Sequence, residues 1–77
     1  MSYDVFVKNM ADVSKKFGEK VKEIRLNNNM SQADLAKILG VHPMDISGIE
    51  RGVQNIALKN IELLAKALNV SVKDLVE

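Results

Sequence analysis

The chain has 77 residues, of which 47% are hydrophobic and 27% charged, and its formal net charge is +1. This length fits one small domain that buries about 60% of its unfolded surface, so a partner would add needed stability. The absence of cysteine excludes disulfides and thiolate metal sites, and fits a reducing cytoplasm. Apolar runs are far shorter than the roughly 20 residues that cross a bilayer, and the first nine residues do not resemble a signal peptide. We therefore expect a cytoplasmic domain without a membrane partner.

An apolar residue recurs every three or four positions through the first third of the chain, as on one face of a helix. These residues are Phe6, Met10, Val13, Phe17, Val21 and Ile24. Gly18 interrupts the stripe and weakens a helix by about 1 kcal/mol relative to alanine. The sequence therefore predicts either one helix from about residue 3 to 28 or two helices that meet near Phe17.

Two short helices follow, each with its own start signal. Ser31 is placed to cap the first, and Asp34 three positions later approximates a capping box. Gly40 ends that helix at a position that favours positive φ. Pro43 suits the first turn of the next helix, with His42 before it as a poor cap. We expect the two helices to be joined by the turn at residues 40–42.

The last part of the chain predicts two more helices. Residues 53–57 read as a loop, and an apolar stripe of helical period then runs to Asn69. Ser71 and Asp74 repeat the capping pattern and open a short last helix. No segment alternates with the period of a strand. The predicted fold is all-α, with five helices, or six if the first stripe is broken.

Residue sizes in the two short helices predict a helix-turn-helix. Leu35 and Leu39 anchor the first helix to the core, and Ala36 is small where the two helices cross. Ile46 and Ile49 bury one side of the second helix and hold it at a steep angle to the first. That angle lets the second helix enter a major groove while the first lies across the DNA backbone.

These residues resemble the lambda-repressor-like, Xre/Cro-type regulators. The matching segments are residues 30–41 (MSQADLAKILGV), 46–52 (ISGIERG) and 65–70 (AKALNV). The resemblance covers about residues 17–77 and leaves residues 1–16 as an N-terminal extension that we expect to be helical. The segment ISGIERG is similar to that of the controller proteins of restriction–modification systems, which are small stand-alone dimers. The resemblance implies a compact five-helix domain that regulates transcription as a dimer on a (pseudo)palindromic DNA operator.

The resemblance also implies an ion pair between Arg25, late in the first helix, and Glu50, late in the recognition helix. A partly buried pair would tie these two helices together. The alternative is two surface charges that never meet.

The resemblance places the recognition helix at about residues 43–51 and implies two sets of DNA contacts. The base-reading positions are His42, Pro43, Met44, Asp45 and Gly48. The phosphate contacts are Gln32, Ser47, Arg51, Gln54 and Asn55. Base edges favour Arg, Lys, Asn or Gln, and residues 42–48 contain none of these. Specificity therefore depends on an imidazole, a carboxylate that accepts from cytosine, a methionine against a thymine methyl, and DNA shape. Surface capping, for His42 and Asp45, and protein contact, for Met44, are the alternatives.

A homodimer is expected because one recognition helix reads few base pairs, whereas two copies read half-sites about 34 Å apart. The resemblance implies an interface on exposed faces of the last two helices, at Val70, Val72, Leu75 and Val76. Phe6, Met10 and Val13 of the extension pack either on the same core or against a partner.

The sequence offers no candidate catalytic site, metal site or cofactor. It has one histidine, no cysteine and no glycine-rich phosphate loop, and no nucleophile lies near His42 and Asp45. Two non-enzymatic alternatives remain. One is an antitoxin that binds a toxin and represses its own operon, and the other is a module whose residues 43–45 bind protein instead of DNA.

Overall fold

Five helices follow one another along the part of the chain that the structure describes, which contains no strand. The computed structural model describes the backbone of residues 3–54 and 56–76, and the side chains of residues 13–54, 56–57 and 59–76. The expected all-α, five-helix class is therefore confirmed.

The first helix, α1, runs unbroken from Tyr3 to Asn27, so the alternative of two helices meeting near Phe17 is wrong. Gly18 lies where α1 passes the end of α3, the third helix. A Cβ atom at this position would come closer to the carbonyl oxygens of Ile49 and Glu50 than real Cβ atoms do. The missing side chain thus permits a close helix contact that outweighs the low helix propensity of glycine.

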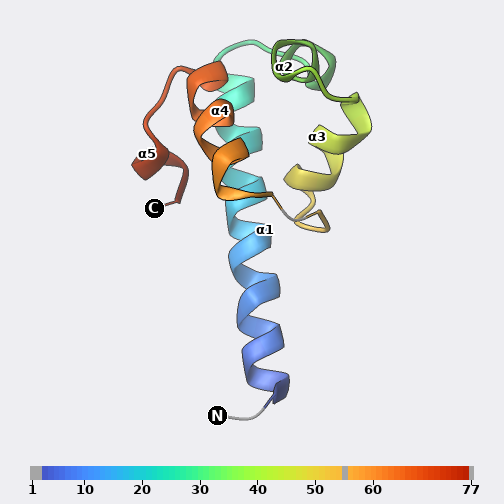
Figure 1. Cartoon of the computed structure of the whole chain (residues 1–77), viewed down its shortest axis with the longest axis vertical. Helices are drawn as coiled ribbons and strands as arrows, with labels where there is room; N and C mark the ends of the chain where they lie inside the picture. The colour runs from blue at the N-terminus through green and yellow to red at the C-terminus, as the bar shows by residue number, and fades with distance from the viewer. Residues whose placement is uncertain (1–2, 55, 77) are drawn as a thin grey trace.

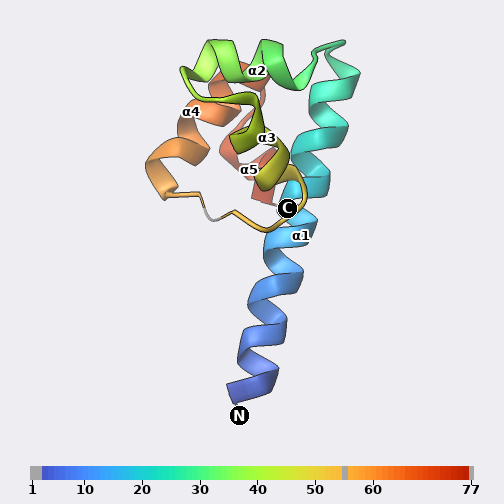
Figure 2. The same ribbon diagram turned by 90° about the vertical axis from the view of Figure 1, so that its right-hand side faces the viewer.

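The other helices gather around the C-terminal half of α1, while its N-terminal half extends away from them (Figures 1 and 2). Helix α2 spans Gln32–Leu39 and α3 spans Pro43–Glu50. Helix α4, Leu58–Leu68, ends at Asn69 with φ of 59°, and α5 covers Val72–Val76. Ser71 and Asp74 form the expected cap, in which each backbone N–H donates to the other side chain at 3.2 Å.

Every helix contributes to one shared core. Its buried members are Val21, Leu35, Ala36, Ile46, Ile49, Leu64, Ala65, Leu68 and Leu75. Because α2, α3 and α4 meet in this core, the position of α3 is fixed by packing as well as by the turn before it. No helix in the described ranges is both long and apolar enough to cross a membrane.

Candidate nucleic-acid interface

The turn between α2 and α3 fixes the direction in which α3 is presented. Gly40 adopts φ of 70°, and its N–H donates to the carbonyl groups of Ala36 and Lys37. Ala36 is small and only 1% exposed, so the two helices can cross closely at this residue. Ile46 and Ile49 are buried on the inner side of α3. The outer side of α3 therefore faces away from the protein, as a recognition helix requires.

His42 caps α3 more completely than the sequence suggests. Its Nδ1 accepts from the N–H of Met44 at 3.1 Å, and the His42 N–H donates to Oδ2 of Asp45 at 3.1 Å. The expectation of a poor cap is wrong because a neutral imidazole nitrogen accepts as a capping oxygen does. The ring proton then lies on Nε2, so the exposed side of the imidazole offers a hydrogen-bond donor.

Asp45 and Gly48 are covered by the loop that follows α3. Gln54 donates from Nε2 to Oδ1 of Asp45 at 3.4 Å, so both carboxylate oxygens of Asp45 have partners inside the protein. Gly48 is buried, and a Cβ atom there would lie 2.5 Å from Oε1 of Gln54. The expectation that Gly48 projects outward is therefore wrong, since Gln54 folds back over it.

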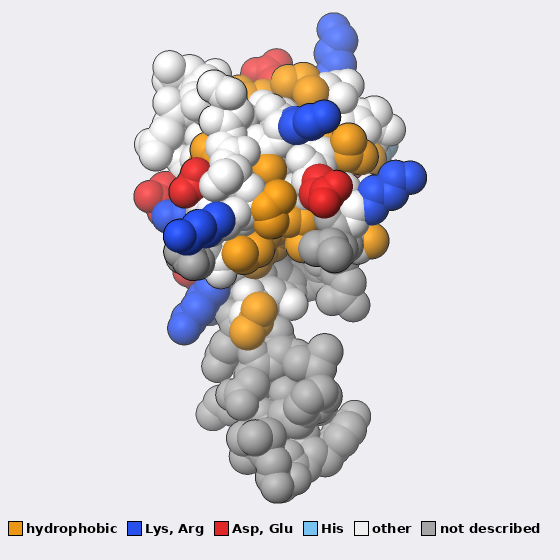
Figure 3. Space-filling model, turned by 60° about the vertical axis from the view of Figure 1, so that its left-hand side comes forward, with side chains coloured by type: hydrophobic (Ala, Val, Ile, Leu, Met, Phe, Trp, Pro, Cys, Tyr) orange, Lys and Arg blue, Asp and Glu red, His pale blue; other side chains and the backbone are white. Residues whose placement is uncertain are grey.

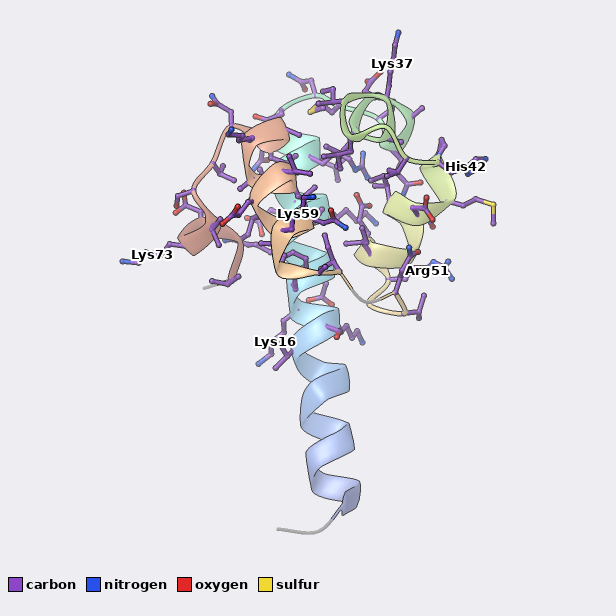
Figure 4. All side chains as sticks on the ribbon, viewed as in Figure 1. Lys16, Lys37, His42, Arg51, Lys59 and Lys73 are labelled. Carbon is purple, nitrogen blue, oxygen red and sulfur yellow. The ribbon has the colours of Figure 1, made fainter. Side chains whose placement is uncertain are left out.

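Four residues of the motif do face outward. Met44 is 73% exposed, and His42 and Pro43 are also exposed. Arg51 points away from α3, as His42 does (Figure 4). Its Nε donates to the carbonyl oxygen and the hydroxyl of half-buried Ser47, both at 3.3 Å. The outer nitrogens of that guanidinium are directed to solvent and suit a phosphate.

A charged cluster joins α1, α2 and α3 behind this surface. Arg25 donates to both oxygens of Glu50, at 2.6 and 3.0 Å, and also to the Met30 carbonyl at 2.7 Å. Both ion-pair residues are buried, at 5% and 7% exposure. The hydrogen bonds to Glu50, above all, raise the pKa of Arg25. The structure thus brings together the two charges whose pairing the sequence suggested.

Gln32 belongs to the same cluster. Its Nε2 donates to Oε1 of Glu50 at 3.2 Å, and the residue is half-buried. The side chain is therefore directed inward, and a phosphate contact at this position depends on the backbone amides of the first turn of α2. A carboxylate already occupies that helix end, because Asp34 accepts from the Ser31 N–H at 2.9 Å. This hydrogen bond is the main reason that the pKa of Asp34 lies below its usual value.

The helix-turn-helix family model matches residues 21–75, most of the chain. The chain belongs to the Xre/Cro-type helix-turn-helix family of DNA-binding transcriptional regulators. It is 52% identical over 62 residues to control protein C.BamHI of Bacillus amyloliquefaciens, covering 79% of this chain and 76% of that protein. It is 42% identical over 64 residues to control protein C.SmaI of Serratia marcescens, covering 83% and 76%. The crystal structure of the restriction-modification controller protein C.AhdI from Aeromonas hydrophila superposes with a TM-score of 0.78 and 38% identity, covering 84% of this chain and 97% of that one.

The four residues expected at the dimer interface of this family member differ in accessibility. Leu75 is only 1% exposed and belongs to the core, so the expectation that it lies on an exposed face is wrong. Val70 and Val72 are half-buried and pack against the core, while Val76 is 59% exposed. Asn55, expected near phosphate, lies outside the described residues.

Among the hydrogen bonds at the site that the sequence did not predict, two join side chains from different segments of the chain. These are the bond from Gln32 to Glu50 and the bond from Gln54 to Asp45. Neither has a local sequence signal, because the first joins residues 18 positions apart and the second joins a helix to the loop after it. The sequence predicted only a poor cap at His42, because histidine is not among the preferred N-cap residues.

Proposed function

We propose that two copies of this chain bind a two-fold-symmetric DNA operator, each with α3 in one major groove, and regulate transcription from it. The observation that carries this proposal is the exposed outer side of α3, with Met44 73% exposed at its start while Ile46 is fully buried behind it. Two-fold pairing sets the recognition helices about 34 Å apart, so that each reads one half-site. We assign the chain to the cytoplasm, where such a regulator meets DNA.

Base reading is assigned to the start of α3. The Nε2–H of His42 suits the acceptor atoms of guanine, and the Met44 side chain suits a thymine methyl. Pro43 contributes apolar contact between them. Asp45 mainly holds the helix cap and Gln54, and any cytosine contact uses a lone pair that these bonds leave free.

Backbone contacts are assigned to the two ends of the motif. The outer guanidinium nitrogens of Arg51 reach one phosphate, with Ser47 orienting the side chain. At Gln32 only the backbone amides of α2 contact another phosphate, and this contact is weak because the Asp34 carboxylate lies at the same helix end. Gln54 and Asn55, which follow Arg51 in the sequence, are assigned to the DNA backbone next to the Arg51 phosphate.

Few charges support this binding, so it should depend only moderately on salt. Capping carboxylates of Asp34 and Asp45 stand at the N-termini of both helices of the motif, where they repel phosphate. The net charge of +1 adds no general attraction. Shape and deformability of the operator therefore contribute much of the specificity.

In vitro selection from a random duplex library tests the proposal directly. The expected result is a two-fold-symmetric consensus whose half-site centres lie about 10 base pairs apart. A selection that never rises above the starting library would overturn it. Capture of a protein through residues 43–45 by a chain that selects no DNA would instead indicate a protein-interaction module.

Salt-dependent fluorescence anisotropy on the selected duplex then tests the assigned contacts. Arg51→Ala should reduce the slope of log affinity against log salt by roughly 1 per copy, because one phosphate contact is lost. Lys73→Ala is the matched control, since Lys73 lies on the far side of the molecule from Arg51 (Figure 4). Equal slopes for both variants would contradict the role of Arg51.

The control proteins among the relatives suggest what is regulated. We propose that the operator lies beside genes of a restriction–modification system. The function is binding alone, with no catalytic step. The antitoxin alternative is not favoured, because the relatives at 52% and 42% identity are control proteins.

A further inference from the structure

An open apolar groove lies where α1 leaves the rest of the fold. It has a volume of about 520 Å³, and its apolar lining includes Val13, Phe17, Ile49, Ile56, Ile61 and Val76. Hydrophobic side chains are exposed on the side of the molecule where α4 and α5 lie (Figure 3). The groove thus joins the base of α1 to the end of α5, next to the exposed Val76.

The apolar stripe of α1 continues beyond this groove. We call residues 3–12 of this helix the N-terminal arm. Val13 is 67% exposed at the base of the arm, and in the sequence the apolar spacing of three or four residues continues from Val13 to Met10 and Phe6. The ribbon of the arm extends clear of α2–α5 in both views (Figures 1 and 2). The apolar spacing therefore continues from the groove into the part of α1 whose backbone α2–α5 do not flank.

We propose that the arm of a second copy fills this groove, in a two-fold pair whose α1 helices run antiparallel. Stripe spacings of four, three and four residues read the same in both directions. Antiparallel pairing therefore sets Met10 of the partner subunit level with Val13, and Phe6 of the partner subunit level with Phe17. The contact is isologous, so each arm enters the groove of the other copy and both apolar stripes are covered.

Two further observations favour a second copy as the occupant. The groove includes Val76, so an arm in it would extend the interface that the family resemblance implies on the last two helices. The arm also lies outside residues 21–75, which the family model matches. This inference rests on the dimer in the proposed function and adds which segments of the two copies contact each other.

Sedimentation equilibrium of the full chain tests the arm exchange. Val13→Lys adds a charge to a groove that Lys16 and Lys20 also line, and should weaken the dimer about tenfold or more, because an apolar contact is lost and like charges come together. Leu26→Lys is the matched control, since Leu26 lies on the same helix, is 53% exposed and does not line the groove. Circular dichroism verifies that both variants fold. Equal dimer affinities for the two variants would overturn the proposal, as would a chain that is a monomer at high micromolar concentration.

A cross-link tests the antiparallel register independently. The chain has no cysteine, so only the introduced cysteines can form a disulfide. An equimolar mixture of a Met10→Cys chain and a Val13→Cys chain should form a covalent dimer on oxidation, because the register brings the two cysteines of different copies side by side. An equimolar mixture of a Met10→Cys chain and a Leu26→Cys chain should not. Equal yields from both pairs, or none from either, would refute the register.

These outcomes separate the two proposals. A Val13→Lys variant that still dimerises and selects the same two-fold duplex would remove the arm exchange and leave the proposed function intact. A wild-type chain that dimerises through the arm yet selects no DNA would do the reverse.

Discussion

Removing the carboxylate of Glu50 should destabilise the protein severely. Glu50→Ala deletes the acceptors of two hydrogen bonds from Arg25, at 2.6 and 3.0 Å, and of one from Gln32, at 3.2 Å. It also leaves the Arg25 guanidinium unpaired at 5% exposure. Breaking a buried pair from one side costs about 3–5 kcal/mol, chiefly because the remaining charge stays desolvated. A domain of this length has a total free energy of unfolding of roughly 4–12 kcal/mol, so the substitution removes a large part of it.

Thermal unfolding followed by circular dichroism measures this loss. For a small domain each 1 kcal/mol moves Tm by about 4–8 °C, so the variant should melt roughly 12–40 °C below wild type. Glu62→Ala is the control, because Glu62 is exposed on α4 and should change stability by less than about 0.5 kcal/mol. Replacing Arg25 and Glu50 together by methionine should restore much of the loss, since no charge is then stranded. A Tm for Glu50→Ala within about 3 °C of wild type would refute the reasoning.

Three other changes have definite expected outcomes. Gly18→Ala should lower Tm although alanine has the higher helix propensity, because its Cβ would meet the backbone of Ile49; a raised Tm would contradict this. Asp34 adds stability that is complete above its unfolded pKa and is lost as pH falls through its lower folded pKa. The stability advantage of wild type over Asp34→Ala in urea should therefore narrow as pH falls through that range, and a constant gap would count against the capping box. His42→Asn should keep the cap and the Tm while weakening operator binding several-fold in anisotropy, and unchanged binding would remove His42 from the contacts.

The scaffold of the motif was predictable because its signals are local. Ser31 with Asp34, Gly40 and Pro43 each act on backbone groups within a few residues, so their spacing alone indicates the helix ends. The apolar period likewise predicted which side of α3 is buried.

The site was harder to predict because its decisive contacts are long-range. The period of α3 places Gly48 on the outer side, but only the folded loop shows that Gln54 covers it. Gln32 looks free at a helix start until α3 brings Glu50 within hydrogen-bonding distance. The sequence around Leu75 does not distinguish a buried residue from an exposed one. In the structure α5 packs against α1 and α4, and Leu75 is buried. Gly18 was expected to weaken a helix, and its close contact with α3 could not be seen in the sequence.

Hydroxyl-radical footprinting on the selected duplex tests the central claim most directly. Two copies that each place α3 in a major groove should protect two blocks whose centres lie about 10 base pairs apart on one face of the DNA. Wild type and Lys73→Ala should give the same pattern, and Arg51→Ala should weaken both blocks equally. A single protected block, or two blocks on opposite faces of the duplex, would contradict the account.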